Sequence, residues 1–280
     1  MLIAKNIRQA RKFLNKYRLL RKSVGFVPTM GALHQGHSSL IRLARKENDI
    51  VAVSIFVNPA QFAPHEDLKK YPRDLNSDAR VCAKEKVDLI FYPRPEEMYP
   101  KGYKTFVKVE GLSEVLCGKF RPGHFRGVST VVLKLFNIIL PDKAYFGQKD
   151  AQQAAIIKKM AEDLNVPTQI KIVPTVRSED GLALSSRNNY LSGREKEKAL
   201  ILCSSLSLAR EMVKSGVRDA KTIIGQMRKL IVRVKEAKID YVAIVDPATL
   251  QDVLFVKKGD LVCLAVWIGK TRLIDNLLVD

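Results

Sequence analysis

The chain has 280 residues, 46% of them hydrophobic, which is typical of a globular protein with one large domain or two smaller ones. No apolar run approaches the roughly 18 residues of a membrane-spanning helix, so we expect no membrane partner. The net charge of +19 comes from 48 basic and 29 acidic residues spread along the whole chain, without a long basic block or interleaved aromatic residues. This spread predicts a general attraction for small anions and argues against a nucleic-acid partner.

Residues 1–22 are basic and contain no acidic residue, so they partly imitate a transit peptide. Their apolar residues nevertheless follow helical spacing: Ile3, Ile7, Ala10, Leu14 and Tyr17. We therefore expect a surface helix packed on the domain rather than a removable leader.

The four cysteines are far apart and form no CxxC pair, which predicts reduced thiols and a cytoplasmic location.

Residues 24–43, VGFVPTMGALHQGHSSLIRL, join a buried strand to a helix. The apolar run 24–27 predicts the strand, Pro28 should end it because proline lacks a backbone donor, and the helix should begin near His37. His34 and His37 thus lie three residues apart in a Gly-bearing turn at a helix start, which favours an anion such as phosphate. Imidazoles there can donate hydrogen bonds to phosphate oxygens. Two alternatives stay open: the histidines could bind zinc, although no Cys, third His or acidic cluster lies nearby, or they could be ordinary loop histidines.

Strands and helices alternate through the middle of the chain. We expect strands at 50–57, 87–92, 143–146 and 169–173, helices at 74–86, 127–140 and 151–164, and within the irregular stretch 93–126 a strand at 105–109 and a short helical piece at 112–116. This order predicts an α/β fold with a Rossmann-like, doubly wound parallel sheet. Ligands of such sheets bind beyond the carboxyl ends of the strands. Polar clusters follow three of those ends: His34 and His37, then Asn58 and Gln61, then Lys149 and Asp150.

The pattern changes near Val176. Ser192 and Glu195 form a capping-box pair that predicts a helix to about residue 214, and a second helix should span about 219–234. Strands at 241–245, 261–267 and 272–274 should pair in antiparallel fashion. We therefore expect two domains: a Rossmann-like binding domain over residues 1–175 and a smaller α+β lid domain over 176–280.

Two loops carry groups suited to phosphate. Lys149 in FGQKD is a compact cation, although alone it would be an ordinary surface lysine, and Asp150 is either a helix cap or an acceptor for ribose hydroxyls. In LALSSRN, Ser185, Ser186 and Arg187 would grip pyrophosphate, unless the stretch is simply a polar hinge.

Two neutral amides follow the second strand. Asn58 and Gln61 suit a carboxylate that must attack phosphorus, because an arginine pair would blunt its nucleophilicity; the alternative is that Asn58-Pro59 is only a turn. His124 in RPGHFRG is a weaker candidate with a plausible structural role.

The string PTMGALHQGHSSLI closely resembles the signature of the pantoate–β-alanine ligases, and its His-X-Gly-His core resembles the HIGH motif of related nucleotidyltransferases. NPAQF, YPRD, RPGHFRGV, FGQKD and LALSSRN follow in the order of that family. The resemblance implies that pantoate attacks the α-phosphorus of Mg-ATP to give pantoyl adenylate and pyrophosphate. The amine of β-alanine would then displace AMP to give pantothenate. The family also suggests a homodimer.

The resemblance implies roles for named residues. ATP contacts fall on Met30, Gly31, Ala32, Leu33, His34, Gln35, Gly36, His37, Gly147, Gln148, Lys149, Asp150, Val176, Leu184, Ser185, Ser186 and Arg187. Pantoate contacts fall on Gln61 and Gln153, with β-alanine near Gln61 and Asn58 beside it, and His37 is the proton donor. We expect His34, His37, Lys149 and Arg187 to supply positive donors.

Magnesium should accompany the nucleotide without an assigned protein ligand; Asp74 and Asp78 are the only residues considered for it. Leu184, a position often occupied by Met in the family, is a mild departure that the adenine pocket should tolerate. Two other functions stay open: another HIGH-type adenylyltransferase, which would release pyrophosphate without needing an amine, and a basic RNA-binding protein with salt-dependent affinity and no ATP turnover.

Overall fold

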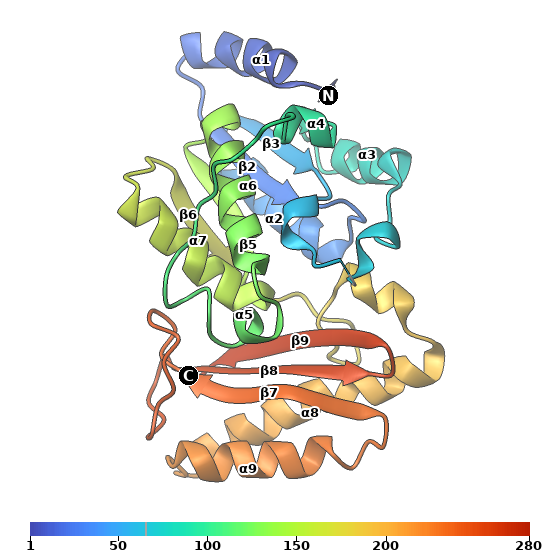
Figure 1. The fold of residues 1–280 in the computed structure, drawn as a ribbon, viewed down its shortest axis with the longest axis vertical. Coiled ribbons are helices and arrows are strands. Elements are labelled where there is room, and N and C mark those ends of the chain that lie inside the picture. Colours follow the sequence, from blue (N-terminus) through green and yellow to red (C-terminus); the bar gives the residue numbers. More distant parts are fainter. Residues whose placement is uncertain (65) are drawn as a thin grey trace.

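The computed structural model describes residues 1–64 and 66–280. Within these residues the chain forms a six-stranded sheet of order β1-β4-β3-β2-β5-β6 and a separate three-stranded sheet of order β7-β8-β9. Figure 1 shows the larger sheet with its helices above the smaller sheet. The larger sheet is parallel and the smaller one antiparallel, so the predicted α/β fold class is confirmed.

The elements have the following bounds. The larger sheet contains β1 (Leu2–Ala4), β2 (Val24–Thr29), β3 (Ile50–Ile55), β4 (Leu89–Phe91), β5 (Lys143–Gly147) and β6 (Gln169–Val173). The helices around it are α1 (Ile7–Leu19), α2 (Gln35–Glu47), α3 (Leu75–Lys84), α4 (Pro95–Met98), α5 (Cys117–Phe120), α6 (His124–Ile139) and α7 (Ala151–Asp163). Short 3-10 turns are η1 (Pro59–Gln61), η2 (Asp67–Lys69), η3 (Gln148–Asp150) and η4 (Ser186–Tyr190). The C-terminal unit contains α8 (Gly193–Lys214), α9 (Ala220–Ile231), β7 (Ala237–Val245), β8 (Leu261–Ile268) and β9 (Thr271–Leu278).

Both faces of the larger sheet are buried. Successive strand side chains point to opposite faces, so Phe26 and Ala144 pack into the core shared with α1, α6 and α7, whereas Val27 and Tyr145 pack with α2 and α3. Two covered faces explain why a strand such as β3 reads as a nearly continuous apolar run.

The N-terminal stretch begins with a strand that helical spacing did not predict. Ile3 lies in β1, which pairs in parallel with β4, and α1 begins only at Ile7, after the cap residue Asn6. The expected packing of the helix is confirmed, because Ala10 and Leu14 are fully buried in the core. A three-residue strand is too short to create a period of its own, so the apolar spacing of the sequence groups Ile3 with the helix that follows.

Pro28 does not end its strand, because β2 continues to Thr29. The carbonyl oxygen of Val24 accepts from the backbone of Asp142, so this residue faces the β5 side of the strand. Pro28, four residues further on, faces the same side, and the β5 ladder has already stopped at Phe26. The missing N–H of the proline therefore costs no hydrogen bond between strands.

Two short expected elements are wrong. Residues 105–109 form no strand; the Val107 N–H donates instead to Thr130 Oγ1 on α6. Residues 112–116 are turns, and the helical piece begins at Cys117. The other expected strands and helices are present with ends shifted by a few residues.

The capping box predicted for the C-terminal unit is confirmed at the start of α8. Ser192 Oγ accepts from the Glu195 N–H, and the Glu195 carboxylate accepts from the Ser192 N–H.

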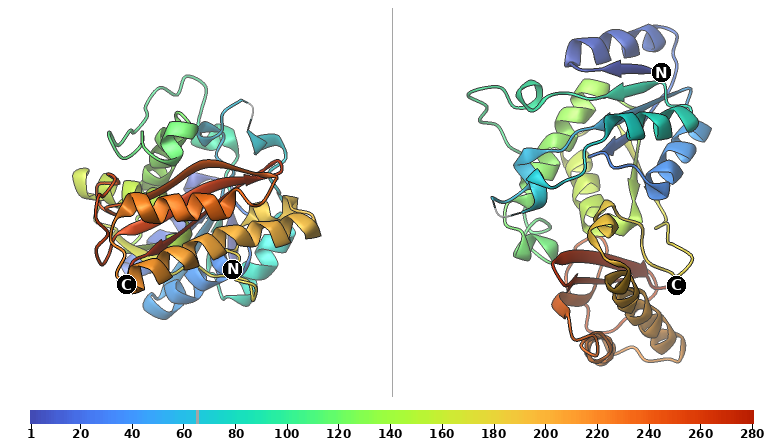
Figure 2. Two further views of the ribbon diagram at one scale, coloured as in Figure 1. Left: turned by 90° about the horizontal axis from the view of Figure 1, so that it is seen from below. Right: turned by 90° about the vertical axis from the view of Figure 1, so that its right-hand side faces the viewer.

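The C-terminal unit places the strand β9 toward the larger sheet. Helices α8 and α9 lie on the side of the small sheet away from the larger unit, and β9 lies nearest to it (Figures 1 and 2). Among the described residues, no helix is both long and apolar enough to cross a membrane.

Candidate active site

A cleft of about 1290 Å³ lies between the two sheets and draws its walls from both. Most residues singled out from the sequence line it: Met30, His34, Gly36, His37, Asn58, Gln61, Gly147, Lys149, Asp150, Gln153, Val176, Leu184, Ser185, Ser186 and Arg187. Five of the residues with implied ATP contacts do not line it: Gly31, Ala32, Leu33, Gln35 and Gln148. The fold thus gathers segments that are far apart in the sequence at the carboxyl end of the parallel strands, where ligands of such sheets bind.

The two motif histidines form a cap at the start of α2, which begins at Gln35 rather than near His37. His34 Nδ1 accepts from the Gly36 N–H at 3.1 Å, and His37 Nδ1 accepts from the His34 N–H at 3.2 Å. The ring centroids are 4.2 Å apart. Because both Nδ1 atoms accept, each neutral ring carries its proton on Nε2.

Burial keeps both rings neutral. It lowers the pKa of His34 to about 4, with the positive charge of Lys149 as the next cause. It lowers the pKa of His37 to about 3, with His34 and then Lys149 contributing. Burial therefore favours neutral rings at neutral pH, and the expectation that these histidines supply positive donors stays a prediction. Each supplies one neutral Nε2–H.

The Asp78 side chain binds the backbone of the loop that precedes the two histidines. Its carboxylate accepts from the Ala32 N–H at 3.1 Å and the Leu33 N–H at 2.8 Å. Gly31 has φ of 87°, and a Cβ there would lie 2.8 Å from Asp78 Oδ2, so the close approach needs glycine.

The two residues considered for magnesium have structural roles instead. Asp78 holds the loop, and Asp74 caps α3 by accepting from the Ser77 N–H. Neither lines the cleft. Within residues 1–64 and 66–280, no group of three or more His, Cys, Asp or Glu side chains is arranged to hold a metal ion.

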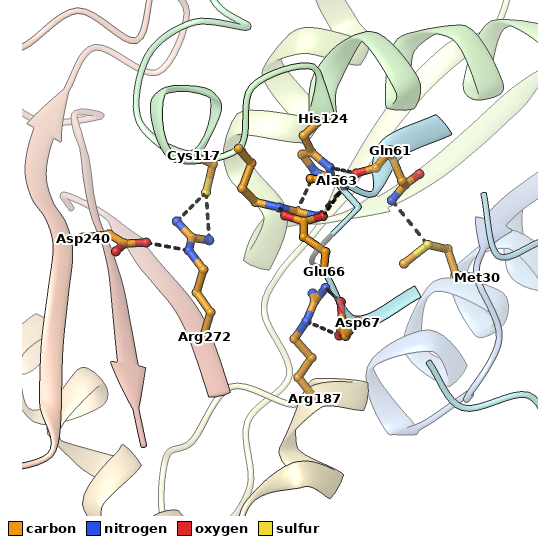
Figure 3. Close-up of polar contacts among 11 residues, drawn as sticks. Met30, Gln61, Ala63, Glu66, Asp67, Cys117, His124, Arg187, Asp240 and Arg272 are labelled. Atoms are coloured by element: carbon orange, nitrogen blue, oxygen red, sulfur yellow. Dashed lines mark hydrogen bonds and ion pairs between the residues drawn. The ribbon is translucent and has the colours of Figure 1, made fainter. Parts of the chain in front are cut away.

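Asn58 and Gln61 have different roles. Asn58 is buried; its Nδ2 donates to Gln61 Oε1 and to the Gly127 carbonyl, each at 3.1 Å, and its Oδ1 accepts from Tyr99 Oη at 2.8 Å. Gln61 Nε2 lies 3.3 Å from Met30 Sδ, a weak acceptor (Figure 3). Asn58 thus supports Gln61, whose Nε2 contacts this weak acceptor among the described residues.

Lys149 follows β5 in the turn η3. Its Nζ lies 3.6 Å from Asp150 Oδ1, which is an ion pair without a short hydrogen bond. The Asp150 side chain makes no capping hydrogen bond to α7, so its carboxylate is not used as the cap that the sequence allowed. Gln153 follows one helical turn later and also lines the cleft.

Arg187 is paired with an acidic residue that sequence reasoning missed. Its Nε and Nη2 donate to the Asp67 carboxylate at 3.2 and 3.1 Å (Figure 3). Beside it, the Ser186 and Tyr71 hydroxyls lie 3.1 Å apart. Asp67 and Tyr71 belong to an irregular segment without a periodic pattern, so only the fold reveals that they face Arg187.

A second arginine, also missed, supports the Gln61 backbone. Arg121 donates to both carboxylate oxygens of Glu66, at 2.6 and 2.7 Å, and its Nη1 lies 3.0 Å from His124 Nε2. Since Arg121 can only donate, His124 carries its proton on Nδ1 and donates to the Gln61 carbonyl at 2.9 Å. Burial lowers the pKa of His124 to about 3. His124 therefore has the structural role that its Pro-Gly neighbours suggested.

The far end of the cleft links the C-terminal sheet to α5. Arg272 Nε donates to Asp240 Oδ2 at 2.7 Å, and its Nη1 and Nη2 lie 3.5 and 3.6 Å from Cys117 Sγ (Figure 3). The Trp267 indole N–H donates to the other oxygen of Asp240. These contacts connect the C-terminal sheet to α5 of the larger unit.

Comparison with known proteins gives full-length matches. A sequence model of the family described as pantoate-beta-alanine ligase matches residues 2–278. Over 280 residues the chain is 51% identical to a pantothenate synthetase of Caldicellulosiruptor bescii and 53% identical to one of Moorella thermoacetica, covering 100% of this chain and 99% of each relative.

Solved structures agree with the sequence matches. A pantothenate synthetase of Thermus thermophilus superposes with a TM-score of 0.95 at 44% identity, covering 99% of both chains. A pantoate-beta-alanine ligase of Francisella tularensis, complexed with beta-gamma ATP and beta-alanine, superposes with a TM-score of 0.83 at 38% identity, covering 99% of this chain and 97% of that one.

Proposed function

The chain belongs to the pantoate–β-alanine ligase family, whose ATP-dependent reaction condenses pantoate with β-alanine, and from this we propose that the cleft between its two sheets carries out that condensation. One observation carries the proposal: His34, His37, Gln61, Lys149 and Arg187 come from separate segments and line the same cleft. Together they offer neutral and cationic donors for phosphate and an amide for an acid.

ATP binds along the loops that begin α2, precede α7 and join the two units. The Nε2–H groups of His34 and His37 donate to phosphate oxygens, with His37 as the proton donor, and Lys149 and Arg187 neutralise the phosphate charge. The Francisella complex supports this assignment, because a relative covered almost to its full length was solved with a nucleotide and β-alanine. The other nucleotide contacts are those that the family resemblance implied.

Pantoate binds beside the nucleotide, against Gln61 and Gln153. Its ionised carboxylate attacks the α-phosphorus, and pyrophosphate leaves to give pantoyl adenylate. The attacking group needs no activating base, so these residues contribute orientation and charge stabilisation. A neutral amide holds the carboxylate without an ion pair that would weaken it as a nucleophile.

β-Alanine completes the reaction near Gln61. Its amine attacks the acyl carbon of the adenylate, AMP leaves, and an amide bond forms. The cleft volume of about 1290 Å³ is large enough for the nucleotide and the acid together.

Magnesium is proposed as part of the nucleotide substrate. Mg²⁺ usually keeps several waters and binds through substrate phosphates with few protein carboxylates. This suits a cleft whose lining carboxylates are each paired with a basic side chain: Glu66, Asp67, Asp150, Asp240 and Asp275. No protein ligand is assigned to it.

Three further parts of the proposal concern the whole molecule. Residues 1–175 act as the binding domain and residues 176–280 as a lid. The enzyme is a homodimer, which sedimentation equilibrium would test. It works in the cytoplasm, in keeping with its free cysteines.

The test measures pyrophosphate and AMP separately. Pantoate with ATP should release pyrophosphate, and AMP should appear only when β-alanine is added. His37→Ala should slow pyrophosphate release by about 10²-fold or more, because a donor to the developing charge is lost. Arg42→Ala, on the exposed side of the same helix, is the matched control and should leave the rate unchanged. Near-normal release by His37→Ala would remove this residue from the mechanism.

A further inference from the structure

A buried asparagine of the C-terminal sheet forms hydrogen bonds with the turn that carries Lys149. Asn276 lies in β9 and is 5% exposed. Its Nδ2 donates to the carbonyl oxygens of Gln148 and Lys149 at 3.0 and 2.9 Å, and its Oδ1 accepts from Gln148 Nε2 at 3.1 Å. Three hydrogen bonds thus connect one side chain of the C-terminal unit to a turn of the other unit.

Asp275, the residue before Asn276, binds the segment that leads to the second proposed nucleotide-binding stretch. The Asp275 carboxylate accepts from Arg177 Nη1 and Nη2 at 2.6 and 2.9 Å, and Arg177 Nη1 also donates to the Gly181 carbonyl. The backbone N–H of Asn276 donates to Asp275 Oδ1 at 2.7 Å, so the Asp275 side chain is also bound to the backbone of Asn276. Residues 177–181 lead directly into the Ser185–Arg187 stretch.

The turn η3 connects the end of β5 directly to the start of α7. It is a single 3-10 turn of three residues, a geometry with weak hydrogen bonds of its own, so bonds from outside the turn add to its support. The Lys149 side chain has Asp150 as an ion-pair partner only at 3.6 Å. Its position therefore depends on where its backbone is held, and the Asn276 amide binds the carbonyls of the lysine and of the residue before it.

We propose that Asn276 is a positioning residue for Lys149, so that the phosphate-binding lysine is placed by a side chain of the C-terminal sheet. The inference rests on the proposed role of Lys149 and extends it. Its consequence is that efficient transfer of the adenylyl group requires β9 to be docked, because an undocked sheet leaves η3 without these three hydrogen bonds.

The experiment is a double-mutant cycle on pyrophosphate release in the presence of ATP and pantoate. Asn276→Ala should lower kcat by about 10²-fold, the loss expected from a displacement of about 1 Å, with little change in the KM of pantoate. Asn276→Asp keeps the size and the acceptor for Gln148 but turns a carboxylate toward two carbonyls, so it should also lose activity. It serves as the second variant if the alanine variant does not fold. Leu278→Ala, an exposed change on the same strand, is the control and should retain full activity.

The decisive comparison uses Lys149→Ala. In that background, adding Asn276→Ala should change the rate by less than about twofold, because the group being positioned is gone. Equal losses from Asn276→Ala in both backgrounds would overturn the inference while leaving the proposed role of Lys149 intact. Full activity of Lys149→Ala alone would instead overturn the proposed role, and the inference with it.

Discussion

Hydrogen bonds with neighbouring side chains fix the orientation of the Gln61 amide. Asn58 Nδ2 donates to Gln61 Oε1, and Gln61 Nε2 contacts only the weak acceptor Met30 Sδ within the described structure, which leaves it able to donate to the proposed pantoate ligand. Gln61→Glu keeps the size but places a carboxylate against the carboxylate of pantoate. Two like charges about 4 Å apart repel by roughly 4 kcal/mol at an effective dielectric constant near 20. Calorimetric titration should therefore show a large loss of pantoate affinity and little change for ATP.

Protonation of the introduced carboxyl would relieve this repulsion, so the loss should shrink at lower pH. Gln251→Glu makes the same chemical change at an exposed position and should alter neither affinity. An equal loss for pantoate and ATP would show that Gln61 does not line the acid pocket.

At the scale of elements, the close approach of α6 to η1 places Gln61. A Cβ on Gly127 would lie 2.3 Å from the Ala60 carbonyl oxygen and 2.6 Å from the Gln61 nitrogen, and both are backbone atoms. Gly127→Ala should push η1 away from the helix, lowering the free energy of unfolding by about 1–3 kcal/mol. It should also raise the KM of pantoate more than that of ATP. Urea unfolding and steady-state kinetics measure the two effects.

Gly225 in α9 provides the matched control, because a Cβ there meets no atom within 4 Å. Gly225→Ala should stabilise the protein by roughly 0.5–1 kcal/mol, the ordinary gain in a helix interior, without changing either KM. If Gly127→Ala behaved like Gly225→Ala, the contact between α6 and η1 would not control the acid site.

For the whole molecule, three partly buried histidines make stability depend on pH. Burial lowers the pKa values of His34, His37 and His124 to about 4, 3 and 3, whereas in the unfolded chain histidine titrates near 6.5. Below about pH 6.5 the unfolded chain binds protons that the folded chain does not, so the free energy of unfolding falls as the pH falls. Each histidine contributes a slope of at most about 1.4 kcal/mol per pH unit.

Urea unfolding at pH values from about 7 to about 5 should show this loss. His124→Asn removes one of the three groups and should flatten the slope by about one proton, although its stability at neutral pH falls through loss of the bond to the Gln61 carbonyl. An unchanged slope in this variant would mean that His124 titrates normally in the folded protein.

The sequence by itself determined the local features. The alternation of apolar strands and helices predicted the parallel sheet, because side-chain periodicity is fixed by the geometry of each element. The Gly-bearing strand–helix turn marked His34 and His37, and the family strings pointed to residues that line the cleft, such as Gln61 and Lys149. All of these signals lie within short stretches of chain.

Only the tertiary structure decided what those residues face. Burial beside Lys149 makes the histidines neutral, Asp67 pairs with Arg187, and Asn276 reaches Lys149 from a strand more than a hundred residues away. Pro28 is tolerated inside a strand because the neighbouring ladder has ended, which no local pattern records. The physical reason is common to these cases: desolvation, ion pairing and ladder ends depend on partners distant in sequence, so they exist only once the chain has folded.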